Sequence, residues 1–169
     1  MSTTVKVLIS LAVLAVIAAC AATPGRISQT EPVDEINKQQ GLALEGYDPV
    51  AYFTEGKPVA GSDAASYHWR GATWQFSTPE HRDAFIADPE RYAPQFGGYC
   101  AFAMSRGTTV DGDPHQWAIV DGKLYVNNNP LAMTLWNQHR PASIKAGNVN
   151  WPLIPKLPSA TALADPAPR

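Results

Sequence analysis

The hairpin signal between residues 116 and 127 constrains the fold more than any other feature of the sequence. Asp121-Gly122 separates two runs rich in strand-forming residues, 116–120 and 123–127. A two-residue type I′ turn needs a positive φ at both central positions, which Asp-Gly adopts readily. The sequence therefore predicts an antiparallel strand pair joined by a tight turn.

A second hairpin is expected around Gly71. Tyr67 and Trp69 precede this glycine with alternate spacing, and Trp74 and Phe76 follow it in the same way. Alternation with a period of two is typical of strands that bury one face. We expect Trp69, Trp74 and Phe76 to form part of the core.

Helical segments are expected between and after the two hairpins. Ser77, with Glu80 three residues later, fits a capping box and predicts a helix that ends near Asp88. Because strand pairs and helices mix without a regular β-α-β alternation, the predicted fold class is α+β, a small single domain of two β-hairpins packed with short helices. No internal repeat is evident. Further helical stretches are expected at 50–53, 89–92, 130–139 and 143–148.

The N-terminus has the layout of a bacterial export signal. Lys6 precedes an uncharged stretch, 7–19, and the motif Ile-Ala-Ala-Cys at 17–20 resembles a lipobox, whose cysteine becomes lipidated. The stretch is shorter than the roughly 20 residues that a membrane-spanning helix needs. We expect lipid on Cys20 and anchoring at the periplasmic side of the cell envelope, and Ala21 favours the outer membrane. The alternatives are cleavage after Ala21 or Ala22, which releases a soluble periplasmic protein, and a retained transmembrane anchor.

The composition divides the chain into four parts. A lipoprotein signal peptide is expected at 1–19 and a flexible tether at 20–40, which is poor in large apolar residues. The folded domain is expected at 41–157. Residues 158–169 are rich in Pro and Ala and are expected to be a disordered tail.

The charge balance excludes one class of partner. Lys and Arg number 13 against 15 Asp and Glu, a net charge of -2. A nucleic-acid binder needs a basic surface that neutralises phosphates. We therefore expect no nucleic-acid partner. The membrane, reached through the lipid on Cys20, is the expected partner, and a protein partner is left open.

Several short blocks along the domain carry a family resemblance. Together they resemble the YHS domain family, in its longer exported branch, over about residues 42–155. The blocks are 46–53 (Gly-Tyr-Asp-Pro-Val-Ala-Tyr-Phe), 74–77 (Trp-Gln-Phe-Ser), 82–85 (Arg-Asp-Ala-Phe), 88–92 (Asp-Pro-Glu-Arg-Tyr), 97–101 (Gly-Gly-Tyr-Cys-Ala), 117–125 (Trp-Ala-Ile-Val-Asp-Gly-Lys-Leu-Tyr) and 150–152 (Asn-Trp-Pro).

The resemblance implies a fold more strongly than a metal site. Short YHS domains resemble metal-handling modules found beside copper-transporting ATPases, and the cysteines of their motif are taken as the ligands. On this chain those cysteines fall on Ala51, Ser77 and His81, so all three thiols are absent. Ala offers no donor atom, and Ser is a poor ligand for soft metals.

Cys100 is the one thiol left if Cys20 carries lipid. Met104 lies four residues later, so the two would share a face of a helix, and a thiolate with a thioether suits Cu(I). His81 precedes Phe85 by four residues, which would direct its ring toward the same helix face. Cys100, His81 and Met104 are thus the candidate ligands of a copper or zinc ion. The alternative is that Cys100 is a small buried apolar residue, that His81 is a partly exposed first-turn residue, and that no metal binds.

Catalysis is not expected. The sequence has no Gly-x-Ser-x-Gly elbow, His-Glu-x-x-His helix or phosphate loop. His68, His115 and His139 fit surface or capping positions, and Asp48 fits a helix N-cap. The chain is interpreted as a non-catalytic module that either binds a metal or serves a structural or interaction role. A third hypothesis, an enzyme with Cys100 as its nucleophile, requires a neighbouring base.

Overall fold

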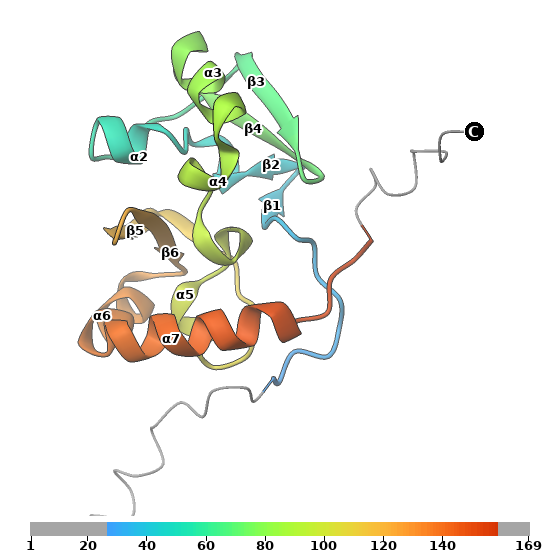
Figure 1. Cartoon of the computed structure of the whole chain (residues 1–169), viewed down its shortest axis with the longest axis vertical. Helices are drawn as coiled ribbons and strands as arrows, with labels where there is room; N and C mark the ends of the chain where they lie inside the picture. The colour runs from blue at the N-terminus through green and yellow to red at the C-terminus, as the bar shows by residue number, and fades with distance from the viewer. Residues whose placement is uncertain (1–26, 159–169) are drawn as a thin grey trace, which may run out of the picture.

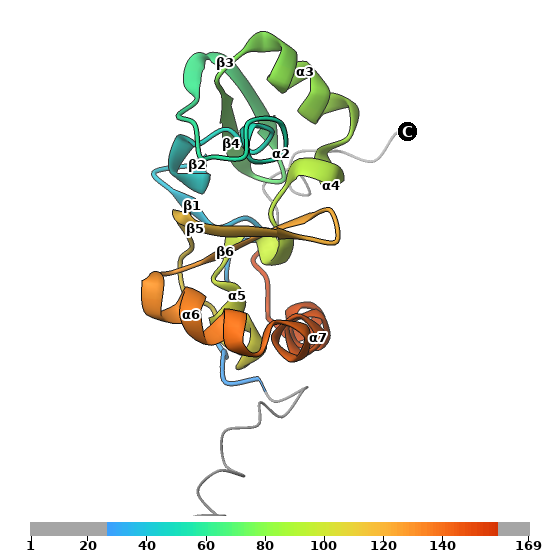
Figure 2. The same cartoon turned by 90° about the vertical axis from the view of Figure 1, so that its left-hand side faces the viewer.

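The computed structural model of the chain describes residues 27–158, which form two halves stacked along the long axis of the molecule (Figures 1 and 2). Each half combines one β-hairpin with short helices. The predicted α+β class is therefore confirmed. The expected signal peptide, the lipidation site Cys20 and all of the expected tail except Pro158 lie outside the described residues.

The first half is built on a four-stranded sheet. The hairpin partners β3 and β4 are antiparallel, whereas β2 joins β4 in parallel, with Leu42 opposite Thr73. The strands are β1 (Lys38–Gln39), β2 (Leu42–Ala43), β3 (Ser62–Trp69) and β4 (Ala72–Phe76), in the order β1-β2-β4-β3. The helices are η2 (Leu44–Gly46), α2 (Ala51–Thr54), α3 (Pro79–Ala87) and α4 (Pro89–Tyr92).

The second half is built on the two-stranded sheet β5–β6. Its helices α6 and α7 lie side by side at the end of the molecule away from β3 and α3 (Figures 1 and 2). The elements are η3 (Gln95–Gly98), α5 (Ala101–Ser105), β5 (Asp113–Val120), β6 (Lys123–Asn127), α6 (Pro130–Gln138), α7 (Arg140–Asn150) and η4 (Trp151–Leu153).

Both predicted hairpins are present, and the turn at Asp121-Gly122 is of the predicted kind. Asp121 and Gly122 have φ values of 51° and 71°, and Arg70 and Gly71 have φ values of 50° and 75°. Positive φ at two consecutive positions is the signature of a type I′ turn, whose twist matches that of the flanking strands. The sequence prediction for 116–127 is confirmed.

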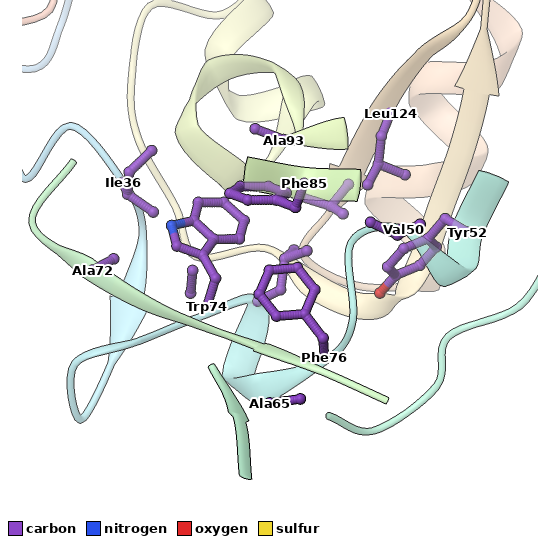
Figure 3. Close-up of a cluster of buried hydrophobic side chains, with 13 residues drawn as sticks. Ile36, Val50, Tyr52, Ala65, Ala72, Trp74, Phe76, Phe85, Ala93 and Leu124 are labelled. Carbon is purple, nitrogen blue, oxygen red and sulfur yellow. The ribbon is translucent and has the colours of Figure 1, made fainter. Parts of the chain in front are cut away.

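Aromatic side chains fill the core of the first half (Figure 3). The ring of Phe85, on α3, lies 5.0 Å from that of Trp74 and 5.2 Å from that of Phe76, measured between centroids. All three side chains are fully buried. Helix α3 is thus held on the sheet by one large anchor, which explains why a helix of nine residues keeps its place.

Two helix starts differ from the sequence predictions. The N-cap of α3 is Thr78, whose hydroxyl accepts a hydrogen bond from His81 N at 3.2 Å, so the capping box of Ser77 and Glu80 is wrong. Helix α7 begins at Arg140 rather than at Ser143. Proline in a first helical turn loses no hydrogen bond and has a fixed φ that suits the helix, so Pro141 favours this earlier start.

The segment before Gly41 is part of the domain. Ile36 is 4% exposed and belongs to the main core cluster. Asn37 donates from its backbone to Gly97 O and from its side chain to Gly98 O. Val33 exchanges backbone hydrogen bonds with the C-terminal segment at 155–157. The expected tether boundary at residue 40 is therefore wrong, because this polar segment is held mainly through its backbone.

The two halves repeat one structural unit. The turn glycines Gly71 and Gly122 are 51 residues apart, and so are the helix N-caps Thr78 and Asn129. Each N-cap side chain accepts from the backbone three residues later, and a proline follows each cap. Each hairpin also places an aromatic ring against an aromatic ring of the next helix, Trp74 against Phe85 and Tyr125 against Trp136.

The correspondence extends upstream of the hairpins. Tyr47 N donates to Leu44 O, and Tyr99 N donates to Phe96 O. The following residues match as well, because Asp48 N donates to Val59 O and Cys100 N to Val110 O. Isolated bridges join Tyr47 to Ala60 and Tyr99 to Asp111. The expectation of no internal repeat is wrong, and Asp48 and Cys100 occupy equivalent positions.

Candidate functional site

The most elaborate polar site in the first half is centred on the carboxylate of Asp48. This side chain is fully buried and accepts five hydrogen bonds. Oδ1 accepts from Val50 N at 2.8 Å and Ala51 N at 3.3 Å. Oδ2 accepts from Ser77 N at 2.9 Å, from Ser77 Oγ at 2.6 Å and from His81 Nδ1 at 2.7 Å. Asp48 therefore holds the turn that leads into α2 and ties it to the start of α3. The N-cap residue of α2 is Val50 rather than the predicted Asp48.

His81 connects this carboxylate to the surface. Its side chain is 18% exposed, and its Nδ1 is held by Asp48. The other ring nitrogen, Nε2, lies 3.3 Å from the hydroxyl of Thr54, which also donates to Val50 O at 3.2 Å. A carboxylate at Nδ1 fixes the orientation of the ring and directs Nε2 outward. The resulting Asp48–His81 pair joins α2 to α3.

The carboxylate has no lone pair to spare for a metal ion. A carboxylate offers about four lone-pair sites, and five donors already surround Asp48. Ser77, which stands where the family resemblance expects a thiol, donates its hydroxyl to Asp48. Of the groups around Asp48, His81 Nε2 and the hydroxyl of Thr54 lie at the surface.

The equivalent position in the second half holds the thiol of Cys100. Cys100 is 2% exposed, and its Sγ donates to Asn127 Oδ1 at 3.7 Å. The same amide oxygen accepts from Phe102 N at 3.0 Å, and Asn127 Nδ2 contacts Met133 Sδ at 3.3 Å. Ala132, the counterpart of His81, packs in one cluster with Cys100. The repeated position is thus polar in the first half and largely apolar in the second.

The three candidate metal ligands lie in different surroundings. His81 is bound to Asp48 in the first half, whereas Cys100 packs with Ala103 and Ala132 in the second. Met104 is fully buried in another cluster, although its backbone N donates to Cys100 O in the first turn of α5. Among residues 27–158, no three His, Cys, Asp or Glu side chains gather as a group that could hold a metal. The copper or zinc site stays a prediction.

The structure adds two residues that sequence reasoning missed around Cys100. Asn127 accepts a hydrogen bond from the Cys100 thiol, and Met133 contacts the amide of Asn127. The sequence instead favoured Met104 as the neighbour of the thiol. The signal that could have found them is the internal repeat, because Asn127 ends the strand of the second hairpin as Phe76 ends that of the first.

The remaining histidines lie at the surface. His68 and His139 are exposed, as expected. His115 is also exposed and contacts Tyr47, with 3.0 Å between Nε2 and the phenol oxygen. None of the three contacts the Asp48–His81 pair.

Buried tyrosines join the two halves. The hydroxyl of Tyr52, on α2, donates to Pro114 O on β5 at 3.0 Å, and the hydroxyl of Tyr99 donates to Asp34 O at 3.1 Å. Burial, reinforced by nearby acidic groups, raises the pKa of Tyr52 well above its ordinary value and that of Tyr99 to about 12. Both phenols are therefore neutral donors at physiological pH.

Comparisons of the chain with family models, with curated proteins and with solved structures found no match. The class of protein is therefore defined by fold and site. It is a small α+β domain of two hairpin–helix repeats, with an Asp–His pair in one repeat and an enclosed thiol at the equivalent place in the other. No helix among the described residues is long and apolar enough to cross a membrane.

Proposed function

We propose that this chain is a lipid-anchored, non-catalytic YHS-like module that serves a structural or interaction role at the bacterial cell envelope without a bound metal. The observation that carries the proposal is that Asp48 and Cys100, which could bind a metal or react, are buried and bonded to other groups of the fold. Asp48 accepts five hydrogen bonds, and Cys100 is enclosed beside an amide and apolar side chains. Buried groups with these hydrogen-bond and packing partners favour a role in stabilising the fold over a role in binding a ligand.

Alkylation tests the non-catalytic part of this proposal. A nucleophilic cysteine needs access and a base that generates the thiolate. Cys100 is 2% exposed, and the Asp48–His81 pair belongs to the other repeat. Iodoacetamide should modify Cys100 only in denaturant, at the rate of an unfolded thiol. Rapid modification of the native protein with a pH midpoint below that of free cysteine would support the thiol-enzyme hypothesis instead.

The anchor is tested by labelling the lipid. The motif at 17–20 motivates the proposal that Cys20 is lipidated and that the protein reaches the outer membrane. Cells that express the chain and are fed an alkyne-tagged palmitate should label it, and the Cys20→Ala variant should stay unlabelled and leave the membrane fraction. Equal labelling of both chains would contradict the anchor. Separation of inner and outer membranes then tests the sorting expected from Ala21.

A second candidate function is metal binding, and the geometry of His81 favours it. Histidines that bind metals commonly have their other ring nitrogen held by a carboxylate. His81 has this arrangement, with Nδ1 on Asp48 and Nε2 directed outward. Titration of the protein with Cu(I) and with Zn²⁺, followed by elemental analysis, decides between the metal-free role and metal binding. Stoichiometric uptake lost in His81→Ala or Cys100→Ala, and retained in His68→Ala, would support metal binding and overturn the metal-free proposal.

A further inference from the structure

We propose that the surface formed by α7 and η4 lies against an anionic phospholipid surface. This inference rests on the lipid anchor proposed for Cys20, and it specifies which side of the domain the anchor brings to the membrane. We base the inference on three observations, which are the distribution of charge, the exposed apolar side chains and the position of the first described residue.

Charge is unevenly distributed along the domain. Residues 27–129 contain 14 Asp and Glu against 7 Lys and Arg, whereas residues 130–158 contain 3 Lys and Arg and no Asp or Glu. The positive segment comprises α6, α7 and η4. An anionic membrane would attract this end of the domain and repel the other end.

The outward face of α7 mixes basic and apolar side chains. Its buried residues are Ser143, Ala146, Gly147 and Asn150, so the opposite face points away from the domain. Lys145 is exposed on that face, and Val149 is 42% exposed. In the η4 turn that follows, Leu153 is 54% exposed. Basic and apolar residues together are typical of helices that lie in the interface of a membrane.

A shallow, largely apolar groove runs beside this face. It lies between α7 and the tip of the β5–β6 hairpin and is lined by Val120, Ile144 and Val149 among others. Arg140 and Lys145 flank it, and Asp121 is the one acidic residue in its lining. The groove offers room for an acyl chain or the apolar part of a headgroup next to two cations.

The chain enters the domain at this same end. Ser28 donates from its backbone and its hydroxyl to Gly107 O, and in both views the first described residues lie at the α7 end (Figures 1 and 2). Seven positions separate Cys20 from Ile27. At no more than about 3.5 Å per residue, they span at most roughly 25 Å. A lipid on Cys20 would therefore hold the α7 end within that distance of the bilayer.

Two matched labelling sites test this orientation. Val149 on α7 and Ile86 on α3 are 42% and 43% exposed, so a cysteine at either site takes up an environment-sensitive fluorophore equally. The lipidated chain, in a Cys100→Ala background, is reconstituted into vesicles of phosphatidylethanolamine and phosphatidylglycerol. The Val149→Cys label should shift to the blue and be quenched by nitroxide lipids, whereas the Ile86→Cys label should do neither. Equal responses at the two sites would overturn the proposal.

Charge reversal tests the role of the basic residues. Lys145→Glu should reduce the ratio of inserted to non-inserted Val149→Cys label at least about fivefold, since each basic residue near an anionic surface contributes roughly that factor to the equilibrium constant. Lys57→Glu, an exposed site in the first half, should change nothing, and phosphatidylcholine vesicles should remove the effect of Lys145. Loss of lipid from the wild-type chain would contradict the proposed anchor, whereas a lipidated chain insensitive to Lys145→Glu would contradict this orientation alone.

Discussion

Asp48 and His81 are 33 residues apart in sequence, yet Asp48 Oδ2 lies 2.7 Å from His81 Nδ1. The contact joins the turn before α2 to the first turn of α3, beside the contact of Thr54 with His81 Nε2. Because Asp48 is fully buried, its carboxylate depends on the donors around it. Asp48 thereby stabilises both the local turn before α2 and the packing of that turn against α3.

The Asp48→Asn variant should lose stability. An amide presents one acceptor atom and one donor atom, so its NH₂ group must face donors that now bond the carboxylate. One buried donor left unsatisfied costs about 1–3 kcal/mol. Urea denaturation should show a lower free energy of unfolding with an unchanged m-value. Asp83→Asn, on the exposed side of α3, is the control and should match the wild type; an equally stable Asp48→Asn would contradict the structural role of the carboxylate.

The internal repeat predicts equal effects at its two helix caps. Thr78 and Asn129 each accept one hydrogen bond from the backbone three residues later, at 3.2 and 2.9 Å. Thr78→Ala and Asn129→Ala should each cost about 1 kcal/mol. The exchanged caps Thr78→Asn and Asn129→Thr should keep most of the stability, as measured by thermal unfolding. A loss at only one cap would mean that the two helices are not held in the same way.

A pair of glycines gives a second test of the repeat. A methyl group at Gly61 would lie 2.4 Å from the backbone carbonyl carbon of Gln75, and one at Gly112 would lie 2.4 Å from Gly98 O. Both glycines precede the first strand of their hairpin, 51 residues apart. Alanine at either site should cost about 1–3 kcal/mol or more, because backbone atoms must move. Ser62→Ala, at the exposed neighbouring position, should be nearly neutral in the same denaturation assay.

Local signals in the sequence predicted both hairpins and the helices α2, α3, α4, α6 and α7, whereas β1, β2 and α5 were not predicted. The Asp121-Gly122 turn and the aromatic alternation around Gly71 depend on neighbouring residues, and both hairpins are present. Helix positions followed in the same way, with errors of a few residues at their starts. Ser77 and Thr78 both suit an N-cap, and the choice between them is made by Asp48, which takes the Ser77 hydroxyl.

The site could not be predicted because its contacts are distant in sequence. Nothing near Asp48 indicates His81, and the neighbour of Cys100 at helical spacing, Met104, belongs to another cluster. The repeat escaped notice because the strand-to-helix segments 68–85 and 119–136 share only their turn glycine and helix-start proline at matching positions. The backbone geometry of the repeat is thus similar in both halves, whereas most side chains at matching positions differ.

The buried tyrosines predict a loss of stability in alkaline solution. The pKa of Tyr99 is raised from its ordinary value of 10.0 to about 12, first by burial and then by Asp34 and Asp111. Between pH 10 and 12 the unfolded chain releases this proton while the folded protein keeps it. The folded state binds more protons there, so the free energy of unfolding falls as pH rises. The stabilisation is complete below pH 10 and is lost as pH approaches 12.

Removing the phenol hydroxyls should flatten this dependence. Each pKa unit corresponds to about 1.4 kcal/mol. Tyr99→Phe should therefore lower the slope of stability against pH above 10, and Tyr52→Phe should do the same, because its pKa is raised as well. Urea denaturation at pH 9, 10 and 11 measures the slope directly. Ser62→Ala, which removes no ionisable group from an exposed strand position, is the control and should keep the wild-type slope. If Tyr99→Phe retained the wild-type slope instead, ionisation of that phenol would not be what limits the fold at high pH.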